Sequence, residues 1–307
     1  MNLIVTSDWH IRASIPENRI DNFLQAQEEK IKFILKKSIE HKAPIIVAGD
    51  IGDKPKWENW LLRKYISMFK SHQEKIYVLP GQHDLPGHRL AQLKQSALGV
   101  LVASKAVVPL LRELVISDCL IVPFPFGKKI KSYHCSIKNK KSIAIIHTLV
   151  SRTKLWSKQE NFISAKNLLK KNNYDFIISG DNHQSFYECY KDKTLINPGS
   201  LMRTTIGQQD HLPRCYLINL TKGSIQKIFI PIKSLDVVFN IEKVKNKNEN
   251  DKRIKAFVNS LDCDLEFKIK FKENLKKFFS KNKTNKKIKN KIFACLENKG
   301  EKTNEGT

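Results

Sequence analysis

The sequence lacks both a long apolar run and a paired set of cysteines. No run approaches the roughly 18 apolar residues of a membrane span, and the apolar start at Asn2–Ser7 meets an acid too soon for a signal peptide. The six cysteines are scattered without a Cys-x-x-Cys pair, which argues against a disulfide framework or a zinc knuckle. We therefore expect reduced thiols, a cytoplasmic location and no membrane partner.

Acidic residues are also few relative to basic ones. The sequence has 30 Asp and Glu and 55 Lys and Arg, which gives a formal net charge of +25. An excess of this size favours a polyanionic partner, of which nucleic acid is the commonest. A Lys- and Asn-rich composition from an AT-rich genome would give the same excess without such a partner. Residues 1–232 and 233–307 are both net basic, so the charge is not confined to a tail.

Apolar and polar residues follow a pattern that predicts an α/β fold. Short apolar runs predict strands and helical spacing predicts the helices between them, in the order 2–7, 22–41, 43–48, 57–71 and 75–79. Strand–helix–strand order is typical of parallel βαβ units. The chain becomes β-rich after residue 185, and a two-sheet α/β/β/α sandwich with helices outside accommodates both parts.

The C-terminal part has a different character. We expect a large domain over 1–232, a small cap region over 233–284, and a basic helix with a polar tail over 285–307. Further elements are expected as a helix at 157–171, strands at 236–244 and 264–271, and short basic helices at 273–280 and 286–296.

Five predicted strands end in a carboxylate, an imidazole or both. The carboxyl ends of strands in α/β sheets form the edge where ligands bind, so we expect these groups to lie together. Asp8 and His10 are two residues apart and point to one side of an extended chain. Carboxylate and imidazole together suit Mn, Fe or Zn. The groups are Asp8-Trp9-His10, Gly49-Asp50, Gly81-Gln82-His83-Asp84, His147 and Gly180-Asp181-Asn182-His183.

Each group alone has a plainer explanation. An Asp-x-His triplet is usually a polar loop, a Gly-Asp pair is a frequent turn, and a lone histidine such as His147 packs in a core or lies on a surface. The conjunction of the five groups, each after a predicted strand, favours a metal centre. Two ions about 3.5–4 Å apart, as used in phosphate ester hydrolysis, would take the side chains of Asp8, His10, Asp50, Gln82, His147, Asp181 and His183.

The order of these groups resembles the signature of the calcineurin-like metallophosphoesterases over about residues 1–232. Within that superfamily, the start at 4–10 and the later Asn197-Pro198-Gly199-Ser200-Leu201 resemble the SbcD-type DNA repair nucleases, particularly the shorter phage-type versions. The resemblance implies a DNA exonuclease, with endonuclease activity left open, working with two Mn²⁺ ions or Mg²⁺ in their place. A phage-encoded chain would act in the host cytoplasm.

The resemblance also distributes the metal ligands. It implies a first ion on Asp8, His10, Asp50 and His183, and a second on Asp50, Gln82, His147 and Asp181. Gln82 and Asp181 depart from the family pattern, which has Asn and His there. Both offer oxygen, so the second site becomes harder, which favours Mn²⁺ or Mg²⁺ over zinc.

Three neighbouring residues receive catalytic roles from the same resemblance. His83 would protonate the leaving sugar oxygen or stabilise the transition state, as a general acid. Asp84 would orient His83. Asp53 lies where relatives often place a second transition-state group.

The expected partners are DNA and an SbcC-like coiled-coil ATPase, and the resemblance is compatible with a homodimer. Arg89, Lys128, Lys129 and Arg203 are expected on loops near the strand ends, where they would contact phosphates. The apolar residues of 286–296 have the helical spacing of a segment that docks in a groove, namely Ile288, Ile292, Phe293 and Leu296. A solvated helix would show the same spacing.

Two alternative functions stay open. One is a small-molecule phosphodiesterase or protein phosphatase of the same superfamily, which the charge and the C-terminal extension argue against. The other is a basic DNA-binding scaffold whose metal site is depleted, with Gln82 and Asp181 as signs of decay.

Overall fold

The computed structural model describes residues 1–117, 119–132, 141–154, 162–240, 253–254, 265–282 and 284–300. It contains two compact units, Met1–Ile241 and Glu242–Thr307, and each is described by itself. No helix within the described ranges is long and apolar enough to cross a membrane.

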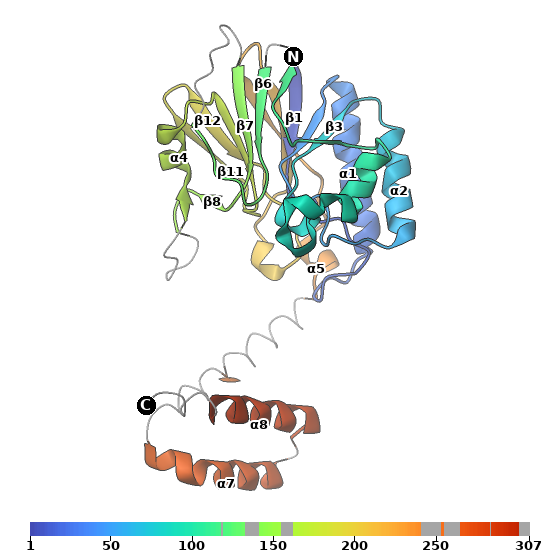
Figure 1. Cartoon of the computed structure of the whole chain (residues 1–307). Helices are drawn as coiled ribbons and strands as arrows, with labels where there is room; N and C mark the ends of the chain where they lie inside the picture. Colours follow the sequence, from blue (N-terminus) through green and yellow to red (C-terminus); the bar gives the residue numbers. More distant parts are fainter. Residues whose placement is uncertain are drawn as a thin grey trace. The chain divides into compact units, whose positions relative to one another are not determined.

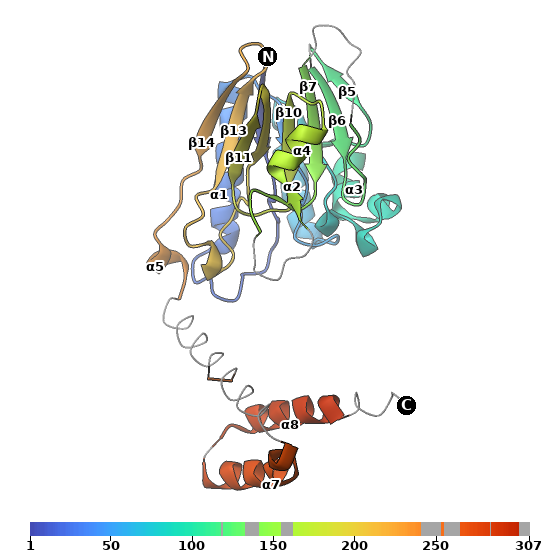
Figure 2. The same ribbon diagram turned by 90° about the vertical axis from the view of Figure 1, so that its left-hand side faces the viewer.

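Two six-stranded sheets form the centre of the first unit (Figures 1 and 2). The first sheet has the order β14-β13-β1-β2-β3-β4, in which β1 to β4 are parallel and β13 is antiparallel to both its neighbours. Its strands are β1 (Asn2–Thr6), β2 (Ile45–Val47), β3 (Ile76–Val78), β4 (Val108–Pro109), β13 (Arg214–Asn219) and β14 (Ser224–Phe229).

The second sheet has the order β11-β12-β10-β7-β6-β5, with parallel pairing from β12 to β6 and antiparallel edges. Its strands are β5 (Leu114–Ile116), β6 (Cys119–Phe124), β7 (Lys141–His147), β10 (Phe176–Gly180), β11 (Phe186–Tyr190) and β12 (Lys193–Asn197). A separate parallel pair joins β8 (Val150–Ser151) to β9 (Ile163–Ser164).

Helices cover the outer faces of both sheets. The first sheet carries α1 (Phe23–Glu40), α2 (Asn59–Lys70) and α3 (Ala97–Ala103), and the second carries α4 (Ala165–Lys171). One buried apolar cluster lies beneath α1 to α3, one lies between the sheets, and one lies beneath α4. The predicted α/β/β/α sandwich is therefore confirmed.

Two predicted elements of the first unit differ from the structure. The helix expected at 157–171 starts at Ala165, where Ser164 caps it by accepting from the Asn167 N–H; residues 155–161 lie outside the described part. In place of the first residues of the strand expected at 236–244 the structure has the short helix α5 (Leu235–Val238), and residues 241–244 lie outside the described part. Val238 and its neighbour Phe239 are both buried, which a turn allows and the alternating faces of a strand do not.

The second unit contains α7 (Leu265–Lys281) and α8 (Lys286–Gly300). The strand expected at 264–271 was wrong, because that alternation belongs to the first half of α7. Leu275 and Phe279 are buried four residues apart, as one helical face requires. Lys, Glu and Leu also favour the helix. The basic helices expected at 273–280 and 286–296 lie within α7 and α8.

Candidate metal centre

The predicted ligands lie at or just after the carboxyl ends of β1, β2, β3, β7 and β10. Asp8, His10 and Asp50 have left-handed φ values of 50°, 45° and 50°, and Asp181 has a φ of 77°. Such backbone costs about 1–3 kcal/mol per residue and persists where the surroundings hold it, often at functional sites. The turns thus stop each strand abruptly and direct its polar side chains to one place.

Two glycines allow the strand ends to approach one another. A Cβ atom at Gly49 would lie 1.9 Å from the Nδ1 atom of His147, and the φ of Gly49 is +100°. A Cβ atom at Gly81 would lie 2.2 Å from an oxygen of Asp50. Only glycine fits these positions without moving a predicted ligand.

Asp8, His10 and His183 form one cluster of candidate ligands, whose ligand atoms lie within 4.8 Å of one another. The Nε2 atoms of His10 and His183 are 3.0 Å apart, and each lies 4.0 Å from the same oxygen of Asp8. The Asp8 carboxylate is completely buried and accepts a hydrogen bond from the Asp181 N–H at 3.1 Å. Three of the four side chains predicted for a first ion therefore lie together, and their role as ligands stays a prediction.

Asp50 connects this cluster to a second one with His147. One oxygen of Asp50 accepts the His83 N–H at 2.8 Å, and the other lies 3.2 Å from the His147 Nε2 atom and 4.0 Å from that of His10. His147 Nδ1 donates to the Ala48 carbonyl at 2.7 Å, so its Nε2 atom faces Asp50. The second Asp50 oxygen therefore lies between the two groups, as a bridging ligand requires.

Gln82 and Asp181 meet beside this second cluster. The Gln82 amide donates to the Asp181 carboxylate at 2.7 Å. Gln82 Oε1 is buried and has no hydrogen-bond partner among the described residues, and the buried Asp50 Oδ2 and His147 Nε2 have no partner there except each other, at 3.2 Å. Buried polar atoms are nearly always paired, and these three are an amide oxygen, a carboxylate oxygen and an imidazole nitrogen. The donor set fits a divalent cation, and Gln82 and Asp181 make it rich in oxygen.

Burial and mutual charge set the protonation of the cluster. Burial raises the pKa of Asp8 and lowers that of His10 to about 3, which keeps the His10 imidazole neutral, the form that binds metal. Burial alone would raise the pKa of Asp50, but the hydrogen bond and charge of His147 lower it. Burial alone would lower the pKa of His147, but Asp50 raises it to about 10. Without metal, this ion pair holds the second cluster together.

The sequence profile of the calcineurin-like phosphoesterases matches residues 1–185, more than half of the chain. The chain belongs to the calcineurin-like phosphoesterase family. The family suggests a metal-dependent hydrolase of phosphate esters, and the clustered carboxylates and imidazoles are the candidate ligands of its metal. A search of curated proteins gave no match.

Solved structures of other phosphoesterases are similar in part. An archaeal phosphodiesterase is 15% identical, with 75% of this chain and 99% of that chain covered and a TM-score of 0.40. A metallophosphoesterase from Sphaerobacter thermophilus is 12% identical, with 76% and 90% covered and a TM-score of 0.36.

In this phosphoesterase, Asp84 does not orient His83, contrary to our expectation. Its buried carboxylate accepts the backbone N–H groups of Gly52 and Gly81, both at 2.9 Å. Burial raises the pKa of Asp84 to about 7, with a further contribution from Asp50. Through these two hydrogen bonds, Asp84 connects the loop after β3 to the loop after β2 and fixes the position of both. His83 Nδ1 instead lies 3.0 Å from the Asp53 carbonyl.

Arg12 is a residue of this site that the sequence analysis missed. Its guanidinium donates to the Asp53 carboxylate at 3.1 Å, and that carboxylate lies 4.0 Å from His10 Nδ1. The signal was available, since Arg12 follows His10 by the same two-residue step that separates His10 from Asp8. Asp53 therefore lies between the candidate ligand His10 and the cation of Arg12.

The predicted DNA contacts fall into two groups. Arg89, Lys128 and Lys129 are exposed on loops, as expected. Arg203 is only 4% exposed, and its guanidinium donates to the carbonyls of Gln209 and Lys233. The expectation that Arg203 lies on an exposed loop was wrong, because the turns around it fold over its side chain.

Proposed function

We propose that the chain is a DNA exonuclease that hydrolyses phosphodiester bonds. It would use two divalent metal ions, and we propose Mn²⁺ as the metal. The supporting observation is the position of exposed cations beside the loop Gln82–Asp84. The Phe126 N–H donates to the Pro80 carbonyl, and the rings of His88 and Phe126 are 5.9 Å apart. The segment of Arg89 and the loop of Lys128 and Lys129 therefore contact each other next to His83.

A basic groove continues from these cations. Its volume is about 700 Å³, and Lys128, Lys129 and Lys171 line it together with Thr148, the residue after the candidate ligand His147. Asn167 and Asn172 add amide groups. Lysine and amide side chains bind the phosphates of nucleic acid without regard to base sequence. A strand whose phosphodiester lies at the metal centre would find these groups beside it.

The side chains at the centre have separable roles in this reaction. Ions held by the two clusters would supply Lewis-acid chemistry, polarising phosphoryl oxygens and acidifying water. His83 donates its Nδ1 proton to the Asp53 carbonyl, which fixes the imidazole and leaves Nε2 for the leaving oxygen. Arg12 donates to the side chain of Asp53, whose backbone carbonyl accepts from His83. Arg12 therefore helps to fix the residue that orients His83.

Replacing Arg89, Lys128 and Lys129 by Ala should weaken cleavage of DNA and spare a small chromogenic phosphodiester. Removing one phosphate contact should reduce the slope of log affinity against log salt by about one. Cleavage rates on both substrates and DNA binding between about 50 and 200 mM salt measure this. An unchanged slope, or equal losses on both substrates, would exclude this surface as the DNA site.

The matched control is Lys36, Lys70 and Lys75 changed to Ala. All three are exposed, in the C-terminal part of α1, at the end of α2 and just before β3. These positions lie at the amino edge of the parallel strands, away from the metal centre. The control removes the same charge and should keep the salt slope near that of the unchanged protein.

We further propose that α7 and α8 dock on a coiled-coil ATPase subunit. Phe279 and Phe293 pack ring to ring, 5.9 Å between centroids, and join the two helices. Phe278 and Ile288 remain 57% and 52% exposed on these basic helices. Exposed apolar side chains on an amphipathic helix suit a hydrophobic groove of a partner.

Changing Phe278 and Ile288 to Ser should abolish co-purification with the ATPase and leave metal binding and basal cleavage unchanged. The reason is that both side chains are exposed and lie outside the first unit. Lys276 and Lys287 changed to Ser provide the control on the same helices. Full association of the Phe278 and Ile288 variant would exclude this docking face.

A further inference from the structure

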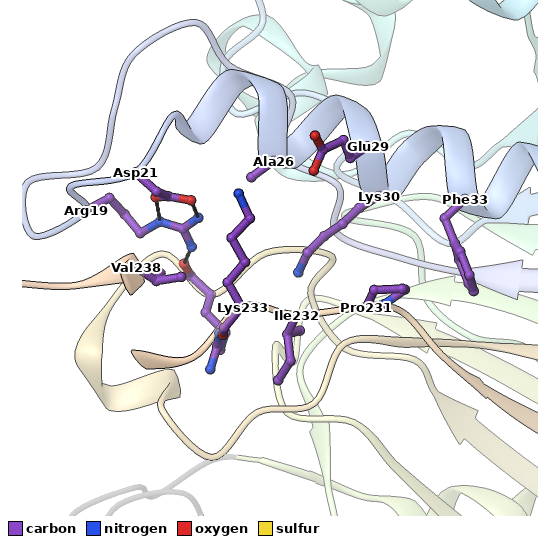
Figure 3. A pocket seen from close by; sticks show the side chains of 11 residues that line it. Arg19, Asp21, Ala26, Glu29, Lys30, Phe33, Pro231, Ile232, Lys233 and Val238 are labelled. Carbon is purple, nitrogen blue, oxygen red and sulfur yellow. Dashed lines mark hydrogen bonds and ion pairs between the residues drawn. The ribbon is translucent and has the colours of Figure 1, made fainter. Parts of the chain in front are cut away.

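A second pocket lies between α1 and the segment after β14, with a volume of about 210 Å³ (Figure 3). Four cationic side chains line it, Arg19, Lys30, Arg203 and Lys233, together with two acidic ones, Asp21 and Glu29. Figure 3 shows Lys30 reaching down from α1 and Lys233 reaching up toward α1. Neither the metal clusters nor the proposed DNA surface uses this pocket.

Arg19 forms an ion pair with Asp21, one of the two acidic residues of the pocket. Its Nε and Nη2 atoms donate to both oxygens of Asp21 at 2.8 Å, and Nη1 donates to the Arg203 carbonyl at 2.6 Å. The side chains of Arg19 and Asp21 are 3% and 5% exposed. This bidentate pair leaves the Asp21 charge fully engaged.

Lys30 and Arg203 are held only by neutral groups in the described part of the chain. Lys30 donates to the Leu201 carbonyl at 3.2 Å, and Arg203 donates to the Lys233 carbonyl at 2.6 Å. A buried charge needs an opposite charge or loses its ionisation. Burial, followed by the charges of Arg203 and Arg19, lowers the pKa of Lys30 to about 7. Four cationic side chains of the pocket thus stand against the two carboxylates of Asp21 and Glu29, of which Asp21 is paired with Arg19, and the lining has an excess of cationic groups.

We propose that this pocket binds a small organic phosphate monoester, with its phosphate at Lys30 and Arg203. A phosphate monoester carries about −1.5 to −2 charges at pH 7, which matches two unpaired cations better than one carboxylate does. Arginine and lysine are the side chains that recognise phosphate. Phe33, Ile232 and Val238 line the same pocket and give the organic part an apolar wall.

The pocket is also connected to the metal centre. Leu201 accepts from Lys30 through its carbonyl and donates through its N–H to the Asp8 carbonyl at 3.1 Å. The next residue back, Ser200, donates to the His183 carbonyl at 3.1 Å. The backbone that receives Lys30 thus also holds two candidate ligands.

The test is calorimetric titration of the full chain in chelator, so that phosphate cannot bind through metal ions. The probes are deoxyadenosine 5′-monophosphate, inorganic phosphate, deoxyadenosine and succinate. We expect the two phosphates to bind, the monophosphate more tightly, and the other two to fail. Lys30→Gln should weaken phosphate binding by about ten- to a hundredfold, the effect of removing a charged hydrogen bond.

Lys233→Gln should also weaken phosphate binding. Because Lys233 is exposed, this variant is expected to fold, so it tests the pocket even if the Lys30 variant misfolds. Lys75→Gln, at an exposed position just before β3, is the control and should bind phosphate as the unchanged chain does. No phosphate binding in chelator, equal binding of succinate, or full affinity in both the Lys30 and Lys233 variants would overturn the proposal.

Discussion

Asp50→Asn is expected to release both ions and to reduce DNA cleavage to background. Asn keeps the size of the side chain and an oxygen that can accept from the His83 N–H, now 2.8 Å away. It removes the anionic oxygen that lies 3.2 Å from His147 and 4.0 Å from His10. Because that oxygen connects the two clusters, both lose their shared negative charge.

Metal content after dialysis and cleavage rate of a labelled duplex measure the Asp50 effect. Asp175→Asn is the control, because Asp175 is also a carboxylate at the sheet but pairs with Lys141 and Ser142 instead. The control should keep its ions and its rate. Two ions retained by Asp50→Asn would contradict the bridging role.

His83→Ala should behave differently, with both ions bound and turnover reduced by about 10²–10⁴, the usual value of general acid–base help. His83 follows Gln82 directly, yet its Nδ1 atom is taken by the Asp53 carbonyl. Its ring meets that of His10 edge-on, 5.0 Å between centroids. The imidazole is thus placed at the rim of the clusters and is fixed in orientation.

The alternative for His83 is specific, since His10, Asp50 and His83 also satisfy the distances of a three-ligand metal group. If His83 is a ligand, its removal should reduce metal content along with turnover. Metal analysis of His83→Ala therefore separates the two roles. His72→Ala is the control, because His72 lies before β3 and contacts the Ser38 hydroxyl, so its rate should change little.

The order of strand ends predicted most of the arrangement, because each polar group directly follows a buried apolar strand. Parallel pairing of β1, β2 and β3 then brings Asp8, Asp50 and His83 to one edge. The ligand roles stay predictions that the metal measurements decide. The geometry adds the pairing of the second Asp50 oxygen with His147 Nε2 and the hydrogen bond from His147 Nδ1 to the Ala48 carbonyl, which no spacing could give.

Other contacts depend on turns that the sequence does not specify. Asp84 was expected to orient His83, but the turn Gln82–Asp84 aims its carboxylate at two backbone N–H groups instead. Arg203 was expected at the surface and is buried by the segment that contains Lys233. In both cases a side chain pairs with backbone from a distant loop, and only the folded chain shows the partner.

The most direct test of the central claim is to titrate the metal-free chain with Mn²⁺ while following the hydrolysis of a labelled DNA duplex. A two-metal phosphodiesterase should show no cleavage in chelator and should reach its full rate when two ions are bound per chain. Cleavage that persists in chelator, or a full rate with one ion bound, would contradict it.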